Sequence, residues 1–314
     1  MVQFVFIGIG AGLASGLMFL SPLGGTSFAL PLFFLSGLPI AIAGLGWGTA
    51  AAAIGALLAT IVLALGISPP AAGIYLAVFG APLTWLTRVT LLSRDTPAGR
   101  EWFPLGRILF HAAAVAALGT IVAGAIVGFD PVALAADMTA MLTSFMTQMA
   151  EVEPPPTAAE LAPFVKFNIS IMPFTVPAVT LAVTVLALWL AARIVSASGR
   201  LTRPRQPMWT AALPREAVLV LVVAAAIAFA PGAVGYAASA AAGAMAAAAA
   251  LAGLAVLHAV TLGLNLRVLI LVAAYVGTVF LGLPIFLFAI VGIVDTFLNF
   301  RARRFGGAPP PSTT

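Results

Sequence analysis

Residues 44–66 read GLGWGTAAAAIGALLATIVLALG, an unbroken apolar run without a charged side chain. A helix needs about 20 such residues to cross the hydrocarbon core of a bilayer, because each residue adds about 1.5 Å. Comparable apolar stretches flank this one at 26–42 and 71–92. The segment therefore predicts one transmembrane helix among several.

The composition of the whole chain agrees with this prediction. Of its 314 residues, 62% are hydrophobic and 7% are charged, whereas a soluble domain has about 25% charged residues. So few charges exclude a soluble enzyme, a disordered chain or a collagen-like protein as the main body. The chain has no cysteine, which excludes a disulfide scaffold and thiolate chemistry.

We predict an all-α, polytopic bundle with about ten spans, in the range of eight to ten, that forms one transmembrane domain over residues 1–300. The first span is expected to be retained rather than cleaved as a signal peptide, because no basic residues precede it. Tight hairpins or partly re-entrant elements are expected at Gly37-Leu38-Pro39 and Gly282-Leu283-Pro284. The expected spans are 3–20, 26–42, 44–66, 71–92, 105–128, 167–195, 216–231, 236–262, 268–282 and 284–300.

The charged residues predict the orientation of the bundle. With ten spans, all thirteen arginines lie on one side, which the positive-inside rule makes cytoplasmic, together with both termini. The other side carries five of the nine acidic residues and the only lysine, Lys166. The basic loops 93–104 and 196–215 are expected to contact lipid headgroups or a cytoplasmic partner. The tail, 301–314, is expected to be cytoplasmic and disordered.

The longest predicted segment outside the spans is 129–166. Asp130 is a good N-cap and Pro131 fits the first helical position, and apolar residues from Met138 to Met149 recur at helical spacing. We expect an amphipathic extracytoplasmic helix that lies along the membrane or covers a cavity. Thr157 and Glu160 form a capping-box pattern that predicts a second short helical turn.

Polar residues and prolines single out the span 167–195 as a candidate cavity wall. Asn168 and Ser170 open this span, and Pro173 and Pro177 follow. Polar groups are costly in hydrocarbon unless they are paired, and each proline frees a backbone carbonyl. The alternative interpretation is a kinked span that begins with polar residues near the surface.

A second group of candidates lies at the cytoplasmic end of the last spans. His258, Asn265 and Arg267 follow one another there, and Asp295 and Asn299 lie one turn apart. Asp295 is expected to pair with Arg267 or Arg301, or to accept a hydrogen bond from Asn265. Such a group is either a gate or proton-coupling site, or a structural pair.

Gly8, Gly12 and Gly16 form a ridge of small residues on the first span. Ridges of this kind let helices approach closely in lipid. The ridge is expected to pack either against another helix of the same chain or against another membrane protein.

Motifs for enzymatic chemistry are absent from the sequence. It contains no phosphate-binding loop, no HExxH helix and no GxSxG elbow, and its two histidines lie far apart. We expect no catalytic residue, cofactor or metal site, and no nucleic-acid partner. The expected partners are the lipid bilayer, a membrane protein or a second copy, and an unknown small-molecule ligand.

Residues 282–303 read GLPIFLFAIVGIVDTFLNFRAR. A glycine-containing last span that ends in Asp295, followed by Asn299, Phe300 and Arg301, resembles the YybS-like bacterial membrane proteins, a family of unknown function. These proteins are distantly similar to the substrate-binding subunits of energy-coupling-factor transporters. The resemblance implies a small-molecule-binding bundle in the bacterial inner membrane, although those subunits usually have six spans.

We therefore expect a multi-pass inner-membrane protein that binds or transports a small, uncharged or weakly anionic solute. Its cavity is expected between the span 167–195 and the C-terminal helices, with the helix in 129–166 as a lid. The alternative is a non-transporting scaffold or assembly factor that packs against other membrane proteins through its glycine ridges.

Overall fold

The computed structural model describes residues 2–97, 99–148, 156–282 and 284–301, and it is 81% helical. Seven helical segments in this part are long and apolar enough to cross a membrane, which confirms a helical membrane bundle. They are α1 (Val2–Phe19), α2 with α3 (Ala29–Phe34 and Leu38–Trp47), α4 (Thr49–Gly66), α5 with α6 (Pro69–Tyr75 and Ala81–Thr90), α7 (Leu105–Val127), α9 (Ala158–Ala197) and α11 (Gly232–Val260).

Three of the predicted spans correspond to shorter helices. These are α10 (Arg215–Ile227), α12 (Arg267–Leu281) and α13 (Pro284–Leu298), and none exceeds 15 residues. At about 1.5 Å per residue they reach roughly 20 Å, less than the ~30 Å hydrocarbon core. The predicted tail from residue 302 onward lies outside the described residues.

A break between α2 and α3 lies beside Gly37-Leu38-Pro39, but the turn between the second and third spans lies at Gly48. Gly48 has φ +94°, a conformation that favours glycine. Gly37 instead keeps a helical conformation, and Pro39 lies in the first turn of α3, where its missing N–H is tolerated. The α5–α6 span contains a π-helical turn, η2 (Leu76–Gly80).

The central helix of the bundle is α11. In its most apolar window 67% of the residues are buried, against 22–44% in the other spans. It packs against α7, α9, α10 and α13. Its many alanines and glycines explain this position, because small side chains let neighbouring backbones approach closely.

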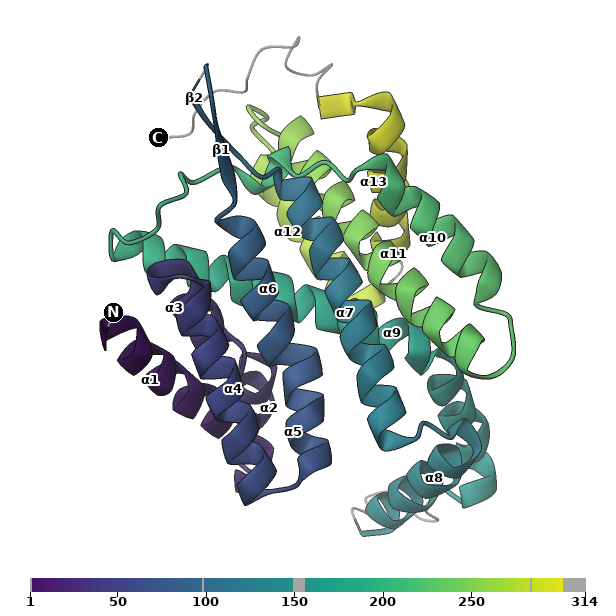
Figure 1. Ribbon diagram of the computed structural model, residues 1–314. Helices are drawn as coiled ribbons and strands as arrows, with labels where there is room; N and C mark the ends of the chain where they lie inside the picture. Colours follow the sequence, from purple (N-terminus) through teal and green to yellow (C-terminus); the bar gives the residue numbers. More distant parts are fainter. Residues whose placement is uncertain (1, 98, 149–155, 283, 302–314) are drawn as a thin grey trace.

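The predicted basic loop 93–104 contains a β-hairpin that the sequence analysis missed. Strands β1 (Ser93–Thr96) and β2 (Gly99–Trp102) pair antiparallel, with Arg94 opposite Glu101 and Asp95 opposite Arg100. Both opposite-charge pairs form exposed ion pairs, at 2.7 and 3.1 Å. Exposed pairs add little stability, but they favour this register because like charges are not placed opposite one another. The hairpin projects from the top of the bundle in Figure 1.

The extended segment at the other end of the molecule forms a helical arm. Helix α8 (Pro131–Gln148) begins where predicted, with Asp130 Oδ1 accepting from the backbone N–H groups of Val132 and Ala133. Thr157 and Glu160 form the predicted capping box, but they start the 40-residue helix α9 itself. At about 60 Å, α9 is twice as long as the bilayer core is thick. Its first turns therefore extend beyond the bundle beside α8.

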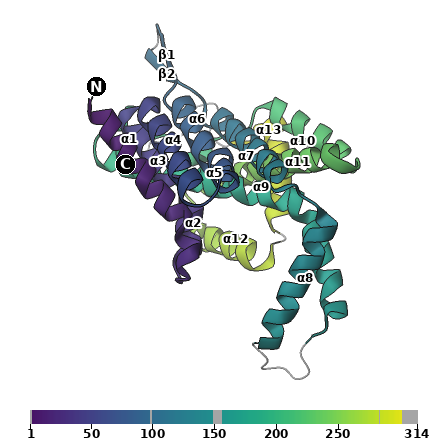
Figure 2. The same ribbon diagram turned by 60° about the horizontal axis from the view of Figure 1, so that its bottom comes forward.

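The position of α8 does not support the predicted lid. Its main contact is with α9, where Ala135 packs with Val165 and Ile169. Figure 2 shows α8 projecting away from the other helices. Met138, Met141 and Phe145 are all exposed. The predicted continuation of its apolar stripe to Met149 lies outside the described residues.

Candidate functional site

The polar residues predicted to line a cavity in α9 are satisfied within that helix. The Asn168 side-chain amide donates to the Phe164 carbonyl at 2.9 Å, and the Ser170 hydroxyl donates to the Phe167 carbonyl at 2.7 Å. Both residues are exposed and lie in the part of α9 near α8. They therefore do not line a space enclosed by the bundle.

The predicted cavity between α9 and the C-terminal helices is replaced by direct backbone packing. Helix α9 continues through Pro173 and Pro177. A methyl group added at Gly243 of α11 would overlap the carbonyl oxygen of Phe174, next to Pro173. One added at Gly253 of α11 would overlap the Phe288 carbonyl of α13 in the same way. At these positions the helices touch, because glycine leaves no side chain between them.

Asp295 and Arg301 form a buried ion pair at the C-terminal end of α13, and their side chains are 2% and 10% exposed. Arg301 Nε donates to Asp295 Oδ2 at 2.9 Å. Its Nη1 donates to the carbonyls of Trp209 and Ala211 at 2.9 and 2.8 Å. Of the three partners considered for Asp295, Arg301 is therefore the one that the structure shows. The pair attaches the loop between α9 and α10 to α13.

One oxygen of this carboxylate has no hydrogen-bond partner in the residues that the structure describes. Asp295 Oδ1 is buried and accepts no hydrogen bond in the described part of the chain. Buried polar atoms are nearly always paired, so an unpaired one needs an explanation. Asn299 lies beside the pair: it has φ +49°, and its backbone N–H donates to the Asp295 carbonyl at 2.9 Å.

The other predicted candidates lie around the turn between α11 and α12. The His258 Nε2 and Tyr275 Oη atoms are 2.8 Å apart, which links the end of α11 to α12. Arg267 begins α12, and its Nε atom is buried without a hydrogen-bond partner among the described residues. Asn265 is exposed. Asn168 and Ser170 lie in the part of α9 that packs against α8, and α8 lies at the lower end of the bundle in Figure 1, so the predicted residues do not form one site.

The glycine ridge on α1 is occupied within the chain. Gly8, Gly12 and Gly16 are buried, and a methyl group added at Gly12 would lie 2.6 Å from the carbonyl oxygen of Gly55 in α4. A methyl group added at Gly8 would lie 2.8 Å from the carbonyl oxygen of Ala51 in α4. The ridge therefore packs against α4 of the same chain, which is the first of the two expected alternatives.

Two glycines on α1 make a matched test of this packing. Gly12→Ala is expected to lower the free energy of unfolding by about 1–3 kcal/mol, because α1 and α4 must move apart. Gly10 has nothing within 4 Å of an added methyl group, so Gly10→Ala is expected to be neutral or slightly stabilising. Denaturation of both variants in detergent measures the difference. Equal stability of the two variants would contradict the assignment of the ridge to α4.

A second buried arginine, Arg203, was not identified from the sequence. It is 5% exposed and donates to the carbonyl of Thr90 at 2.9 Å, the carbonyl of Phe103 at 2.8 Å and the Gln206 side chain at 2.6 Å. Burial lowers the pKa of Arg203, but a guanidinium keeps its charge in proteins. Arg203 thus fixes the loop after α9 to the end of α6 and the base of the β-hairpin.

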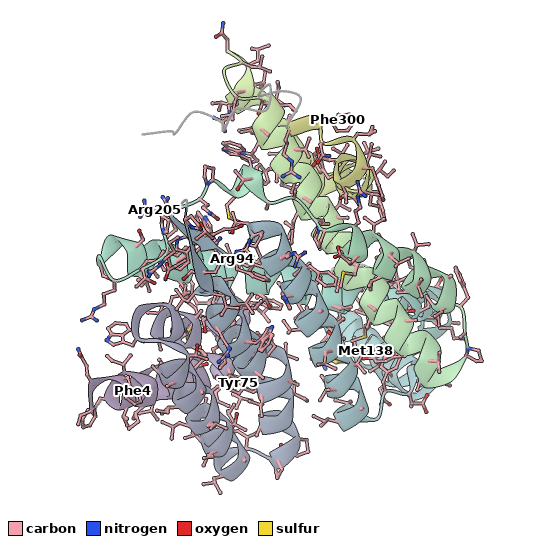
Figure 3. The ribbon with its side chains drawn as sticks, turned by 45° about the horizontal axis from the view of Figure 1, so that its top comes forward. Phe4, Tyr75, Arg94, Met138, Arg205 and Phe300 are labelled. Atoms are coloured by element: carbon pink, nitrogen blue, oxygen red, sulfur yellow. The ribbon has the colours of Figure 1, made fainter. Side chains whose placement is uncertain are left out.

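The N-terminal helices contain a buried polar cluster that the sequence analysis also missed. Ser15 and Tyr75 are 0% exposed. The Ser15 hydroxyl donates to the Ser36 carbonyl and is hydrogen-bonded to the Tyr75 hydroxyl. Because Ser15 has one proton to give, the Tyr75 hydroxyl is the donor in the second bond. Ser15 lies on the same buried face of α1 as the glycine ridge. Its position next to Gly16 is the feature of the sequence from which its burial could have been predicted. Figure 3 shows Tyr75 among these helices.

Tyr75→Phe is expected to lower the free energy of unfolding by about 1–2 kcal/mol, because it removes a buried hydrogen bond. In a double-mutant cycle with Ser15→Ala, the two losses are expected to be clearly less than additive. Thermal melting of the single and double variants in detergent gives the coupling. Fully additive losses would mean that the two hydroxyls act independently.

The fold and these contacts define a multi-pass helical membrane protein in which several arginine-bearing loops meet at one end of the bundle. Compared with protein-family models, curated proteins and solved structures, the chain matches none of them.

Proposed function

We propose that the chain is a multi-pass protein of the bacterial inner membrane that binds or moves a small solute near Asp295. The observation that carries this proposal is a carboxylate that is 2% exposed in an apolar bundle and has one oxygen without a hydrogen-bond partner among the described residues. Ionisable residues within membrane proteins are expensive and mark functional sites by default. The proposed site therefore lies at the end of α13 beside η3 (Met208–Thr210), not along α9.

The resemblance of residues 282–303 to the YybS-like proteins supports the same region. Asp295, Asn299 and Arg301 are residues of the quoted motif, and all three lie together at the end of α13. A small-molecule-binding bundle is what that resemblance implies. Membership of the family remains part of this proposal.

The proposed orientation places the arginine-bearing end in the cytoplasm. Arg203 joins the loop after α9 to the segments around Thr90 and Phe103, and Arg301 joins Trp209 of the same loop to the end of α13. Helix α8, which begins after Asp130 and contains Asp137, lies at the opposite end in Figure 1. Arginine-rich loops favour the cytoplasmic side. In the proposed topology both termini are cytoplasmic as well.

Mass spectrometry of small molecules that co-purify with the protein tests the proposed site. Wild type and Asp295→Asn are extracted from membranes into polymer nanodiscs, and equal amounts of folded protein are analysed. We expect a non-lipid molecule with the wild type and a large loss with Asp295→Asn. Asp137→Asn, an exposed change on α8, serves as the control and should retain the molecule. A wild type without any such molecule, or equal amounts in all three proteins, would argue against the proposal.

A second candidate function is a membrane scaffold or assembly factor. It is favoured by two elements that project from the bundle, the β-hairpin and the arm formed by α8 and the start of α9 (Figures 1 and 2). Isolation in mild detergent distinguishes the two functions. Stoichiometric ATPase subunits support transport, whereas a partner set of membrane structural proteins supports the scaffold.

A further inference from the structure

A surface hollow of about 480 Å³ lies at the base of the β-hairpin, where β1 and β2 meet the start of α7. Its lining includes Ser93, Arg94, Glu101, Trp102 and Arg107. It lies at the end of the bundle away from α8, and none of the residues proposed for the solute site belongs to it. It therefore needs its own explanation.

The hollow carries one unbalanced positive charge. The guanidinium of Arg94 is neutralised by Glu101, with the Arg94 Nη2 atom 2.7 Å from the Glu101 Oε2 atom. Arg107 is exposed and forms no hydrogen bond or ion pair through its side chain within the described part of the chain. The start of α7 adds to this charge, because the N-cap residue Pro104 offers its first amides no side-chain acceptor and a helix N-terminus favours anions.

The position of the hollow matches the headgroup level of a membrane. Arg107 lies in the first turn of α7, an apolar span of 23 residues. Trp102 lies just before this span, and tryptophan is enriched where a span meets the polar headgroups. The hollow thus combines a free guanidinium and the serine hydroxyl of Ser93 with an aromatic ring at this level.

We propose that this hollow binds the phosphate of an anionic phospholipid, with Arg107 as its main contact. A phosphate is the anion that a free guanidinium and a helix N-terminus bind well. The Trp102 ring then lies against the glycerol and upper acyl region. Free phosphate carries the same charge but has no apolar group to contact the Trp102 ring. A phospholipid can contact both the polar residues of the lining and this ring.

Native mass spectrometry of the full chain in detergent tests this site, with phosphatidylglycerol, phosphatidylcholine and inorganic phosphate as separate probes. We expect phosphatidylglycerol to be retained best, and Arg107→Gln to weaken its binding about tenfold, because one charge-assisted contact is lost. Arg107→Lys is expected to restore part of the binding. Arg88→Gln is the matched control, since Arg88 is also an exposed arginine at the end of a span but does not line the hollow.

The other outcomes overturn the proposal in distinguishable ways. Equal losses for Arg107→Gln and Arg88→Gln would mean that the lipid responds to general surface charge. Tight binding of inorganic phosphate, with no preference for phosphatidylglycerol, would assign the hollow to a soluble anion. Because Arg107→Gln changes an exposed side chain, the variant is expected to melt at the same temperature as the wild type. That result shows that the variant is folded.

Discussion

Asp295→Ala is expected to lower the free energy of unfolding by about 3–5 kcal/mol, because it leaves the guanidinium of Arg301 buried without its counter-charge. Arg301 also holds the carbonyls of Trp209 and Ala211, so the loop beside α13 is expected to loosen. Thermal or SDS-induced unfolding in detergent measures the loss. Hydrogen exchange of residues 208–213 measures the loosening.

Two controls separate the ion pair from a general effect of losing a carboxylate. Asp137→Ala removes an exposed acid on α8 and is expected to change stability by less than about 0.5 kcal/mol. The double variant Asp295→Leu with Arg301→Met removes both buried charges and is expected to recover at least half of the loss. If Asp295→Ala melts like Asp137→Ala, the pair does not hold the loop.

Arg203→Met is expected to lower the free energy of unfolding by about 2–4 kcal/mol, because it removes the donors to the buried Thr90 carbonyl and the part-buried Phe103 carbonyl while keeping an apolar side chain of similar length. Limited proteolysis is expected to cut residues 198–214 faster, since this loop loses its attachment to Thr90 and Phe103. Melting in detergent and the rate of cleavage are the two measurements.

Arg205 provides the matched control two residues away. It is exposed, and its side chain donates one hydrogen bond, from Nε to the Ser196 hydroxyl at 2.9 Å. Arg205→Met is expected to change stability by less than about 0.5 kcal/mol. Figure 3 shows Arg205 and Arg94 at the end of the bundle that carries the hairpin. Equal effects of the two substitutions would show that total loop charge, not the buried contacts of Arg203, stabilises this end.

Local patterns in the sequence predicted local features well. The apolar runs predicted the long helices, and Asp130 predicted the start of α8. Thr157 and Glu160 predicted a capping box, which forms, but a short helical turn was expected there and the box starts the 40-residue helix α9. Each of these features depends on residues within one turn or one run of sequence. The chain breaks beside Gly37-Leu38-Pro39, between α2 and α3, but the turn between the two spans lies at Gly48, because a proline in the first turn of a helix does not end it.

Contacts between distant residues could not be read in the same way. The segment 200–205 contains three arginines, and no local pattern shows that Arg203 is the buried one. Its burial depends on carbonyls that lie about a hundred residues away in the chain. The partner of Asp295 could not be predicted either, because three residues were possible and only the packing of the chain shows that Arg301 is the one. Glycines on α11 bring α9 and α13 each into backbone contact with α11, and no local pattern in the sequence showed that these surfaces meet.

The sequence by itself determined that this chain is a helical membrane protein, because the cost of placing charges and free backbone groups in hydrocarbon acts on each segment separately. Only the tertiary structure decided which small residues meet, which arginines are buried and which carboxylate oxygen is left unpaired. Those outcomes depend on how helices from distant parts of the chain pack together, and packing is a property of pairs of surfaces rather than of any one segment.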